Sequence, residues 1–273
     1  MRIFQEPKKL QKWCRMRKLA GAKIALVPTM GYLHDGHLSL IREAKRRGAD
    51  EIVVSVFVNP VQFGPNEDYE KYPRDEKADL AKCLEAGATA VFFPTPANMY
   101  LDRHSVYVTE EDLSKGLCGA RRPGHFRGVC TVVAKLFNLA HPDFAVFGQK
   151  DYQQAQVIKR MVRDLNFDLK IVVAPIVREE SGLARSSRNT YLSTEEREKA
   201  VAISRNLLSF GKKGGVKTLA ALKGRLEKAG LVVDYVECVD AETLEPRKTP
   251  KKGCCILVAV YCGMTRLIDN RVL

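Results

Sequence analysis

Short apolar runs alternate with amphipathic segments through the first two thirds of the chain. The runs are rich in β-branched residues, as in strands that are buried on both faces of a parallel sheet. Apolar residues in the intervening segments recur three or four positions apart, as on one face of a helix. The pattern therefore predicts an α/β protein with a parallel sheet. We expect strands at 22–27, 51–58, 88–93, 142–147 and 170–177, a short edge strand at 106–108, and helices at 11–19, 38–47, 75–86, 129–139 and 155–165.

The pattern changes after residue 177. Ser193 and Glu196 have the spacing of a capping box, which predicts a helix over 195–210. A glycine- and lysine-rich break follows at 211–215. We therefore expect two domains, a larger one over residues 1–177 and a smaller α+β domain over 178–273. The smaller domain should contain a second helix at 219–228, strands at 232–239 and 253–262, and an edge pairing near 267–268.

Composition and charge narrow the class of protein. Hydrophobic residues make up 45% and charged residues 28% of the 273 residues, as is typical of a soluble globular protein. No apolar run approaches the ~20 residues of a membrane helix, and the first residues lack the apolar core of a secretory signal. We therefore expect a cytoplasmic protein with no membrane partner.

The net charge of +13 is compatible with nucleic acid, a membrane surface or an anionic substrate. The lysines and arginines form short clusters with acidic residues between them, so we favour an anionic substrate. The eight cysteines form no C-x-x-C pair, and we expect reduced thiols without a chemical role.

The segment Pro28–His37 lies between the first predicted strand and its helix and contains an H-x-G-H motif. A strand-to-helix turn presents backbone N–H groups and the positive end of the helix dipole, which favours a phosphate. His34 and His37 can donate hydrogen bonds to phosphate oxygens, and Gly36 allows a close approach to the backbone. The motif predicts a nucleotide-binding turn.

Further polar residues follow the other predicted strands, where ligands collect in open parallel sheets. Asn59 and Gln62 can bind a hydroxyl or carboxylate, or can simply belong to a turn. Lys150 brings a point charge suited to phosphate, and Gln154 brings an amide. The basic loop 121–128 either holds an anion or is a solvated loop. The segment Arg185–Arg188, with two serines between two arginines, forms a candidate anion clamp.

Five segments together resemble one family, the pantothenate synthetases (pantoate–β-alanine ligases), within the nucleotidylyltransferases that share the H-x-G-H turn. The H-x-G-H motif alone indicates the superfamily. The longer form P-T-M-G-x-L-H-x-G-H, with V-N-P-x-Q-F and S-S-R-N, is specific to the ligase. The resemblance spans nearly the whole chain and ends with Arg266–Asn270. The matching segments are Pro28–His37, Phe57–Phe63, Arg122–Gly128, Phe147–Gln154 and Ser186–Leu192.

The resemblance implies a Rossmann-like, doubly wound parallel sheet with a smaller C-terminal lid. It also implies a reaction in two steps. The carboxylate of pantoate attacks the α-phosphate of ATP, and the amine of β-alanine then attacks the resulting pantoyl adenylate. Pantothenate, AMP and pyrophosphate are the expected products, Mg²⁺ is expected to accompany ATP, and the family is usually a homodimer.

The resemblance further implies roles for individual residues. His37 matches the family's proton donor, while His34 and Lys150 should contact phosphates. Gln62 should bind pantoate and later β-alanine, and Gln154 should bind pantoate from the other side. Asn59, Tyr72, Arg122 and His125 are lesser members of the expected pocket. The expected ATP site comprises Met30, Gly31, Tyr32, Leu33, His34, Asp35, Gly36, His37, Gly148, Gln149, Lys150, Asp151, Val177, Arg185, Ser186, Ser187 and Arg188.

The chain departs from the family pattern at Arg185 and in the magnesium contacts near the helix expected at 75–86. Arg185 stands where relatives often have an apolar residue or lysine, so its backbone alone can make the ATP contact, and the role of its side chain is left open. The family's magnesium contacts are only partly matched, chiefly by Asp79, and we assign no protein ligand to a metal.

Two alternatives remain. Another H-x-G-H nucleotidylyltransferase would keep that motif but has no need of V-N-P-x-Q-F. A basic RNA-binding protein would need basic and aromatic residues clustered on one face, which the sequence lacks.

Overall fold

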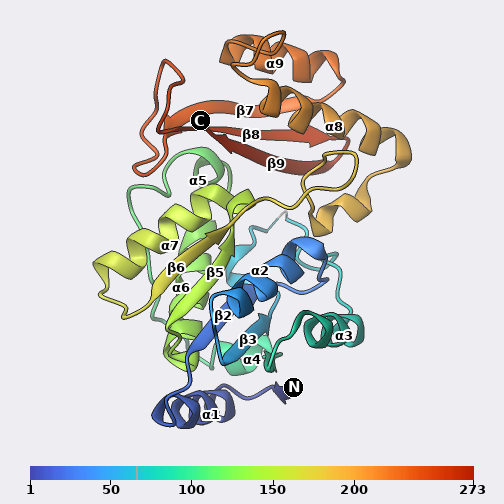
Figure 1. The fold of residues 1–273 in the computed structure, drawn as a ribbon. Helices are drawn as coiled ribbons and strands as arrows, with labels where there is room; N and C mark the ends of the chain where they lie inside the picture. The colour runs from blue at the N-terminus through green and yellow to red at the C-terminus, as the bar shows by residue number, and fades with distance from the viewer. Residues whose placement is uncertain (66) are drawn as a thin grey trace. The chain divides into compact units, whose positions relative to one another are not determined.

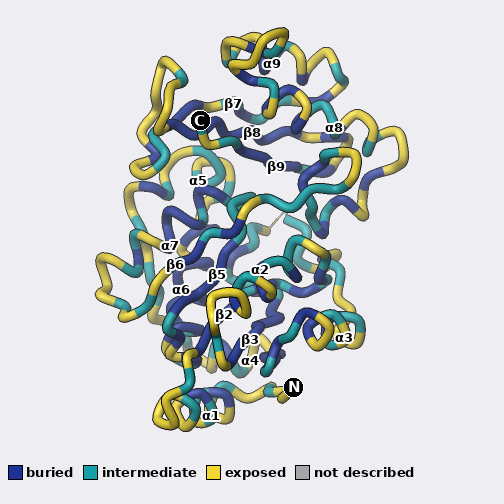
Figure 2. Tube along the Cα trace, viewed as in Figure 1, coloured by how far each residue is buried: buried dark blue, intermediate teal, exposed yellow. Residues whose placement is uncertain are grey.

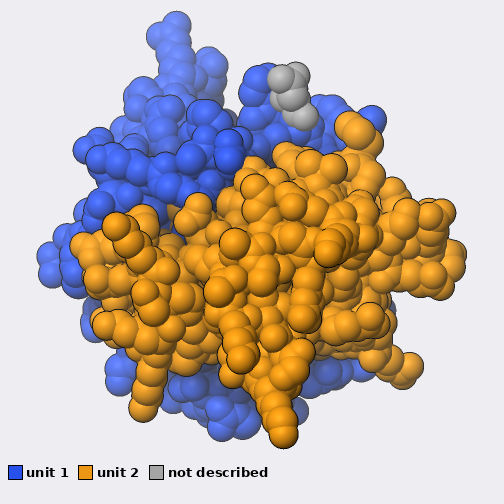
Figure 3. Space-filling model, turned by 90° about the horizontal axis from the view of Figure 1, so that it is seen from above, with its two compact units in different colours: residues 1–148, 154–174 blue, residues 149–153, 175–273 orange. Residues whose placement is uncertain are grey.

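The computed structural model describes residues 1–65 and 67–273, and its chain forms two compact units. Unit 1 comprises residues 1–148 and 154–174, and unit 2 comprises residues 149–153 and 175–273 (Figure 3). A short stretch after residue 148 thus belongs with the C-terminal part of the chain. Buried residues concentrate on the strands of each unit (Figure 2).

Unit 1 is built on a six-stranded sheet in which every pair of neighbouring strands is parallel (Figure 1). The strand order is β1-β4-β3-β2-β5-β6. The strands are β1 (Arg2–Phe4), β2 (Ile24–Thr29), β3 (Glu51–Val56), β4 (Ala90–Phe92), β5 (Phe144–Gly148) and β6 (Lys170–Ala174). The predicted parallel α/β sheet is confirmed, and β1 is an edge strand that the sequence pattern did not indicate.

The chain runs outward from β2 through β3 to β4, and then returns to place β5 on the other side of β2. Ala25 pairs with Phe144, and Leu26 pairs with Ala145. This reversal is a topological switch point, where open α/β sheets bind ligands beyond the carboxyl ends of their strands. The H-x-G-H turn follows β2 at this point.

Helices cover both faces of the sheet, as a doubly wound fold requires. Ala25 and Val27 of β2 belong to a core that also includes side chains of α2 (Asp35–Arg46) and α3 (Glu76–Ala86). The alternate residues Ile24 and Leu26 are fully buried on the other face, where α1 (Pro7–Leu19) and α6 (His125–Ala140) contact β2. The remaining helical segments of this part of the chain are η1 (Pro60–Gln62), α4 (Pro96–Met99), α5 (Leu117–Arg121), η2 (Gln149–Asp151) and α7 (Tyr152–Asp164).

Two local expectations were wrong. Helix α6 starts at His125, after Gly124 in the left-handed conformation at its N-cap, so residues 125–128 of the expected basic loop are helical. The edge strand expected at 106–108 is absent from the described residues. There the backbone N–H of Val108 donates to the hydroxyl of Thr131 (3.0 Å).

Unit 2 contains an antiparallel sheet in the order β7-β8-β9, with two helices packed against it. Ile203 and Leu207 of α8 (Thr194–Ser209) and Leu226 of α9 (Leu219–Lys228) share a core with Ile256 and Val258. The capping box before α8 is confirmed, because Ser193 and Glu196 exchange hydrogen bonds. The strands are β7 (Val232–Asp240), β8 (Cys254–Cys262) and β9 (Thr265–Val272), and the segment before α8 contains η3 (Ser187–Tyr191).

All eight cysteines are free thiols, and all but Cys118 are buried. Within the described residues, no helix combines the length and the apolar character needed to cross a bilayer.

Candidate active site

The H-x-G-H turn links β2 to α2 through a short left-handed segment. Gly31 has φ 85°, and Tyr32 has φ 50°. A side chain at Gly31 would come within 2.9 Å of both Asp79 Oδ2 and the Val56 side chain, so the turn requires glycine there. His34 is the N-cap of α2, and His37 lies in the first helical turn.

Both histidines use the same ring nitrogen to accept a backbone hydrogen bond. The N–H of Gly36 donates to His34 Nδ1 (3.1 Å), and the N–H of His34 is directed at His37 Nδ1 (3.4 Å). The rings stack with 4.1 Å between their centroids. An Nδ1 atom that accepts a hydrogen bond carries no proton, so the proton of each neutral ring lies on Nε2. The turn therefore presents two Nε2–H donors beside the start of a helix.

Two side chains of α3, Asp79 and Lys82, hold the backbone of the turn. The carboxylate of Asp79 accepts the N–H groups of Tyr32 (2.8 Å) and Leu33 (2.7 Å), and Lys82 Nζ donates to the carbonyl of Leu33 (2.6 Å). Burial raises the pKa of Asp79, although the two N–H groups and the Lys82 charge act in the opposite direction. Asp79 thus binds backbone groups through both oxygens and fixes the shape of the turn.

Gln62 lies at the end of β3, in η1, and is buried. Its oxygen accepts a hydrogen bond from Asn59 Nδ2 (3.1 Å), and its nitrogen donates to the sulfur of Met30 (3.0 Å). Unit 1 therefore brings Gln62 against the first residue of the expected ATP site.

Asn59 is a support for Gln62 rather than an open binding group. Besides the bond to Gln62, its Nδ2 donates to the carbonyl of Gly128 (3.1 Å), and its oxygen accepts the hydroxyl of Tyr100 (2.7 Å). Burial raises the pKa of Tyr100, so the phenol keeps the proton that it donates. The sequence left open whether Asn59 binds a ligand or simply belongs to a turn. These contacts within the protein favour the turn interpretation for the Asn59 side chain.

The basic loop is anchored by an ion pair. Arg122 binds both oxygens of Glu67 (2.8 and 2.5 Å) and lies 3.0 Å from His125 Nε2. Arginine can only donate, so His125 Nε2 accepts, and its Nδ1–H donates to the carbonyl of Gln62 (2.9 Å). Burial acts to raise the pKa of Glu67, but the hydrogen bond and charge of Arg122 outweigh it and lower that pKa. The chain Glu67–Arg122–His125 therefore fixes the backbone of Gln62.

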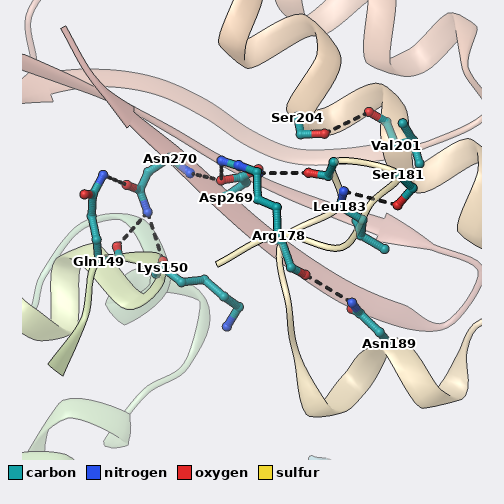
Figure 4. Close-up of polar contacts among 12 residues, drawn as sticks. Gln149, Lys150, Arg178, Ser181, Leu183, Asn189, Val201, Ser204, Asp269 and Asn270 are labelled. Carbon is teal, nitrogen blue, oxygen red and sulfur yellow. Dashed lines mark hydrogen bonds and ion pairs between the residues drawn. The ribbon is translucent and has the colours of Figure 1, made fainter. Parts of the chain in front are cut away.

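In unit 2, the segment Gln149–Asp151 forms η2 and packs against β9. Asn270 on β9 hydrogen-bonds to Gln149 and Lys150 (Figure 4). The ammonium of Lys150 lies 3.4 Å from Asp151 Oδ2, and its side chain is 22% exposed, so it remains partly accessible.

The serine–arginine segment is held by a second set of contacts in unit 2. Arg178 forms a bidentate ion pair with Asp269 (2.7 and 2.9 Å), and a β-bridge joins Arg178 to Ala184. Asn189 donates to Glu179 Oε1 (2.9 Å) and to the carbonyl of Ala184 (3.0 Å). The loop 178–189 is therefore closed on itself before it enters α8.

The predicted site residues divide between the two units. Unit 1 contains Met30–His37, Gln62, Gly148 and Gln154, and it joins Met30 to Gln62. Unit 2 contains Gln149–Asp151, Val177 and Arg185–Arg188. Their convergence on one ligand stays a prediction.

Sequence reasoning missed the supporting residues Glu67, Lys82 and Tyr100. It named Asp269 only within a matching segment, and Asn270 there and beside the expected edge pairing, without a supporting role for either. Two adjacent polar residues within a strand are the signal that could have singled out that pair.

Comparison with known proteins gives a consistent result. Residues 2–272 match the family model described as pantoate-beta-alanine ligase. A protein named pantothenate synthetase from Myxococcus xanthus is 54% identical, and the match covers 94% of this chain and 91% of the relative. Another from Clostridium acetobutylicum is 50% identical, and the match covers 99% of this chain and 98% of the relative.

Solved structures of pantothenate synthetases are similar as well. The enzyme of Thermus thermophilus superposes with a TM-score of 0.89 at 44% identity, and the match covers 99% of each chain. A pantoate-beta-alanine ligase of Francisella tularensis, described in complex with beta-gamma ATP and beta-alanine, has a TM-score of 0.86 at 34% identity, and the match covers 100% of this chain and 97% of the relative.

Proposed function

The chain belongs to the pantoate-beta-alanine ligase family, and on that premise we propose that it condenses pantoate with β-alanine at the expense of ATP. Pantoate would react with ATP to give pantoyl adenylate and pyrophosphate. The amine of β-alanine would then displace AMP and form pantothenate. The Francisella relative, described with an ATP compound and β-alanine, supports both of these substrates.

The observation that carries this proposal is the pair of Nε2–H donors at the start of α2. In adenylation, a carboxylate oxygen attacks the α-phosphorus while negative charge builds on the phosphates. The reaction needs no nucleophile from the protein, and its rate depends on positioning and charge stabilisation. Two fixed imidazole donors and a helix N-terminus supply that stabilisation at the switch point of the sheet.

We assign His37 and His34 to the phosphates, with Lys150 as the third cationic or donor group. Gln62 and Gln154 would bind pantoate, since neutral amides bind hydroxyls without repelling the carboxylate. Gln62 would later bind β-alanine. The remaining ATP contacts would come from the other residues of Met30–His37 and Gly148–Asp151, from Val177, and from Arg185, Ser186, Ser187 and Arg188.

Mg²⁺ is expected to arrive with ATP. Among residues 1–65 and 67–273, no group of three metal-binding side chains is assembled. Asp79, the carboxylate that best matches the family's magnesium contacts, binds the backbone of the turn with both oxygens. The ion would be held largely by the substrate phosphates, as is usual for Mg²⁺ at nucleotide sites.

The test is ATP–pyrophosphate exchange with pantoate present and β-alanine absent. The proposal predicts exchange that requires pantoate, and formation of AMP and an amide once β-alanine is added. Another nucleotidylyltransferase would release pyrophosphate and a nucleotidyl conjugate instead. Exchange that is independent of pantoate, or no exchange at all, would refute the proposal.

We further propose that the protein is a cytoplasmic homodimer, as the family resemblance suggests. Analytical ultracentrifugation at several concentrations tests the dimer, and a single monomeric species at micromolar concentration would contradict it.

A further inference from the structure

Asn270 is a buried amide that binds the backbone of a segment far away in the sequence. It is 2% exposed. Its nitrogen donates to the carbonyls of Gln149 and Lys150, at 2.9 Å each, and its oxygen accepts from Gln149 Nε2 at 3.1 Å. Three of the four hydrogen bonds available to an asparagine amide are thus directed at two consecutive residues.

The neighbouring residue on β9 fixes the strand itself. Asp269 is 3% exposed, and its carboxylate accepts the bidentate guanidinium of Arg178 as well as the N–H of Asn270 (2.8 Å). Asn270 therefore hydrogen-bonds η2, while Asp269 binds the first residue of the loop that contains the serine–arginine segment (Figure 4). One dipeptide of β9 connects both predicted ATP-binding segments of unit 2.

Only an amide satisfies this arrangement. An apolar side chain would remove the donor from two partly buried carbonyls, and a carboxylate would place a second oxygen against them. The contacts also explain why residues 149–153 belong to unit 2, although they directly follow β5 of unit 1. The backbone of η2, which carries Lys150, is therefore held by β9.

We propose that Asn270 is a positioning residue for Lys150: it fixes the backbone from which the ammonium reaches the triphosphate. The inference rests on the proposed function, because it assumes that Lys150 contacts a phosphate. The side chain of Lys150 extends away from the Asn270 amide (Figure 4), so Asn270 acts on the ammonium through the backbone and not through direct contact. A displaced backbone would move the charge out of line with the developing phosphate charge.

A double-mutant cycle tests the proposal, with pantoate-dependent ATP–pyrophosphate exchange as the assay. We expect Asn270→Ala to lower kcat roughly 10- to 100-fold in the wild-type background, because misplacement by about 1 Å costs up to that much. In a Lys150→Ala background the same change should lower kcat by less than about 3-fold, since the group that it positions is gone.

Asn206→Ala is the matched control. Asn206 is also a buried asparagine of unit 2 whose amide donates to a backbone carbonyl, that of Ala202 (2.8 Å), and it lies on α8. Its removal should change kcat by less than about 3-fold. Hydrogen exchange should be faster in residues 150–154 of Asn270→Ala and unchanged there in Asn206→Ala.

An equal loss of kcat from Asn270→Ala in both backgrounds, or no loss in the wild type, would overturn the positioning role. Circular dichroism verifies folding, and if Asn270→Ala does not fold, the isosteric Asn270→Asp takes its place in the same cycle. Wild-type protein without pantoate-dependent exchange would instead refute the proposed function, so the two failures are distinguishable.

Discussion

Gly128 in α6 packs against the backbone of the residue expected to bind pantoate. A methyl group at this position would lie 2.5 Å from the carbonyl oxygen of Val61 and 2.6 Å from both the N and Cα atoms of Gln62. Side-chain carbons do not approach other atoms closer than 3.0 Å, and these neighbours are backbone atoms. Gly128→Ala must therefore displace Gln62 or the start of α6.

The required shift can be worked out from these distances. Widening 2.5 Å to between 3.0 and 3.4 Å needs a movement of roughly 0.5–1 Å, and misplacement by about 1 Å costs up to ~100-fold in rate. We expect kcat/KM for pantoate to fall about 10- to 100-fold, with a much smaller change for ATP. Overpacking should lower the free energy of unfolding by about 1–3 kcal/mol.

The assay is steady-state kinetics with each substrate varied in turn, together with urea unfolding. Gly224→Ala is the control, because Gly224 also lies within a helix but, apart from its chain neighbours and the backbone of its own helix, no atom lies within 4 Å of the added carbon. That variant should gain about 0.5–1 kcal/mol of stability and keep its kinetics. Normal pantoate kinetics in Gly128→Ala, or equal losses for pantoate and ATP, would refute the packing argument.

Three further predictions concern the proposed site. His37→Ala should lower the exchange rate about 100- to 1,000-fold, as expected for loss of a donor to developing charge. The free energy of unfolding should fall by only about 1 kcal/mol, as for a lost helix cap, and near-normal turnover would contradict the role. Gln154→Ala should raise KM for pantoate more than KM for ATP, and equal effects would argue against a pantoate contact. The Arg122 ion pair lowers the pKa of Glu67 below its ordinary 4.5, so the pair stabilises the fold above that pH and the contribution is lost as pH falls through the lowered pKa. Urea unfolding from pH 7 to pH 3 should therefore show that Glu67→Gln is less stable than wild type at neutral pH and that the difference shrinks in acid; a constant difference would contradict this.

The sequence predicted the parallel sheet because its strands are apolar on both faces. The sequence did not predict β1, because this strand has only three residues, of which Arg2 and Ile3 are exposed. Its pairing with β4 is what makes it a strand. Most of β9 was also not predicted, because Arg266, Asp269 and Asn270 interrupt the apolar pattern. In the structure the strand pairs with β8 along its length.

The candidate site shows the same division between local and distant information. The H-x-G-H turn was predictable, since strand, glycine, histidines and helix follow one another in the sequence. The groups that hold it were not, because Asp79 and Lys82 meet Leu33 from 46 and 49 residues away. Asn270 meets Lys150 from 120 residues away. No local pattern encodes such contacts, which arise only when the sheets form.

The most direct test of the central claim is a crystal structure of the protein soaked with ATP. We predict one triphosphate in contact with the Nε2 atoms of His34 and His37, with Lys150 and with the segment Ser186–Arg188. A nucleotide bound elsewhere, or these groups found on separate surfaces without a shared ligand, would contradict the account.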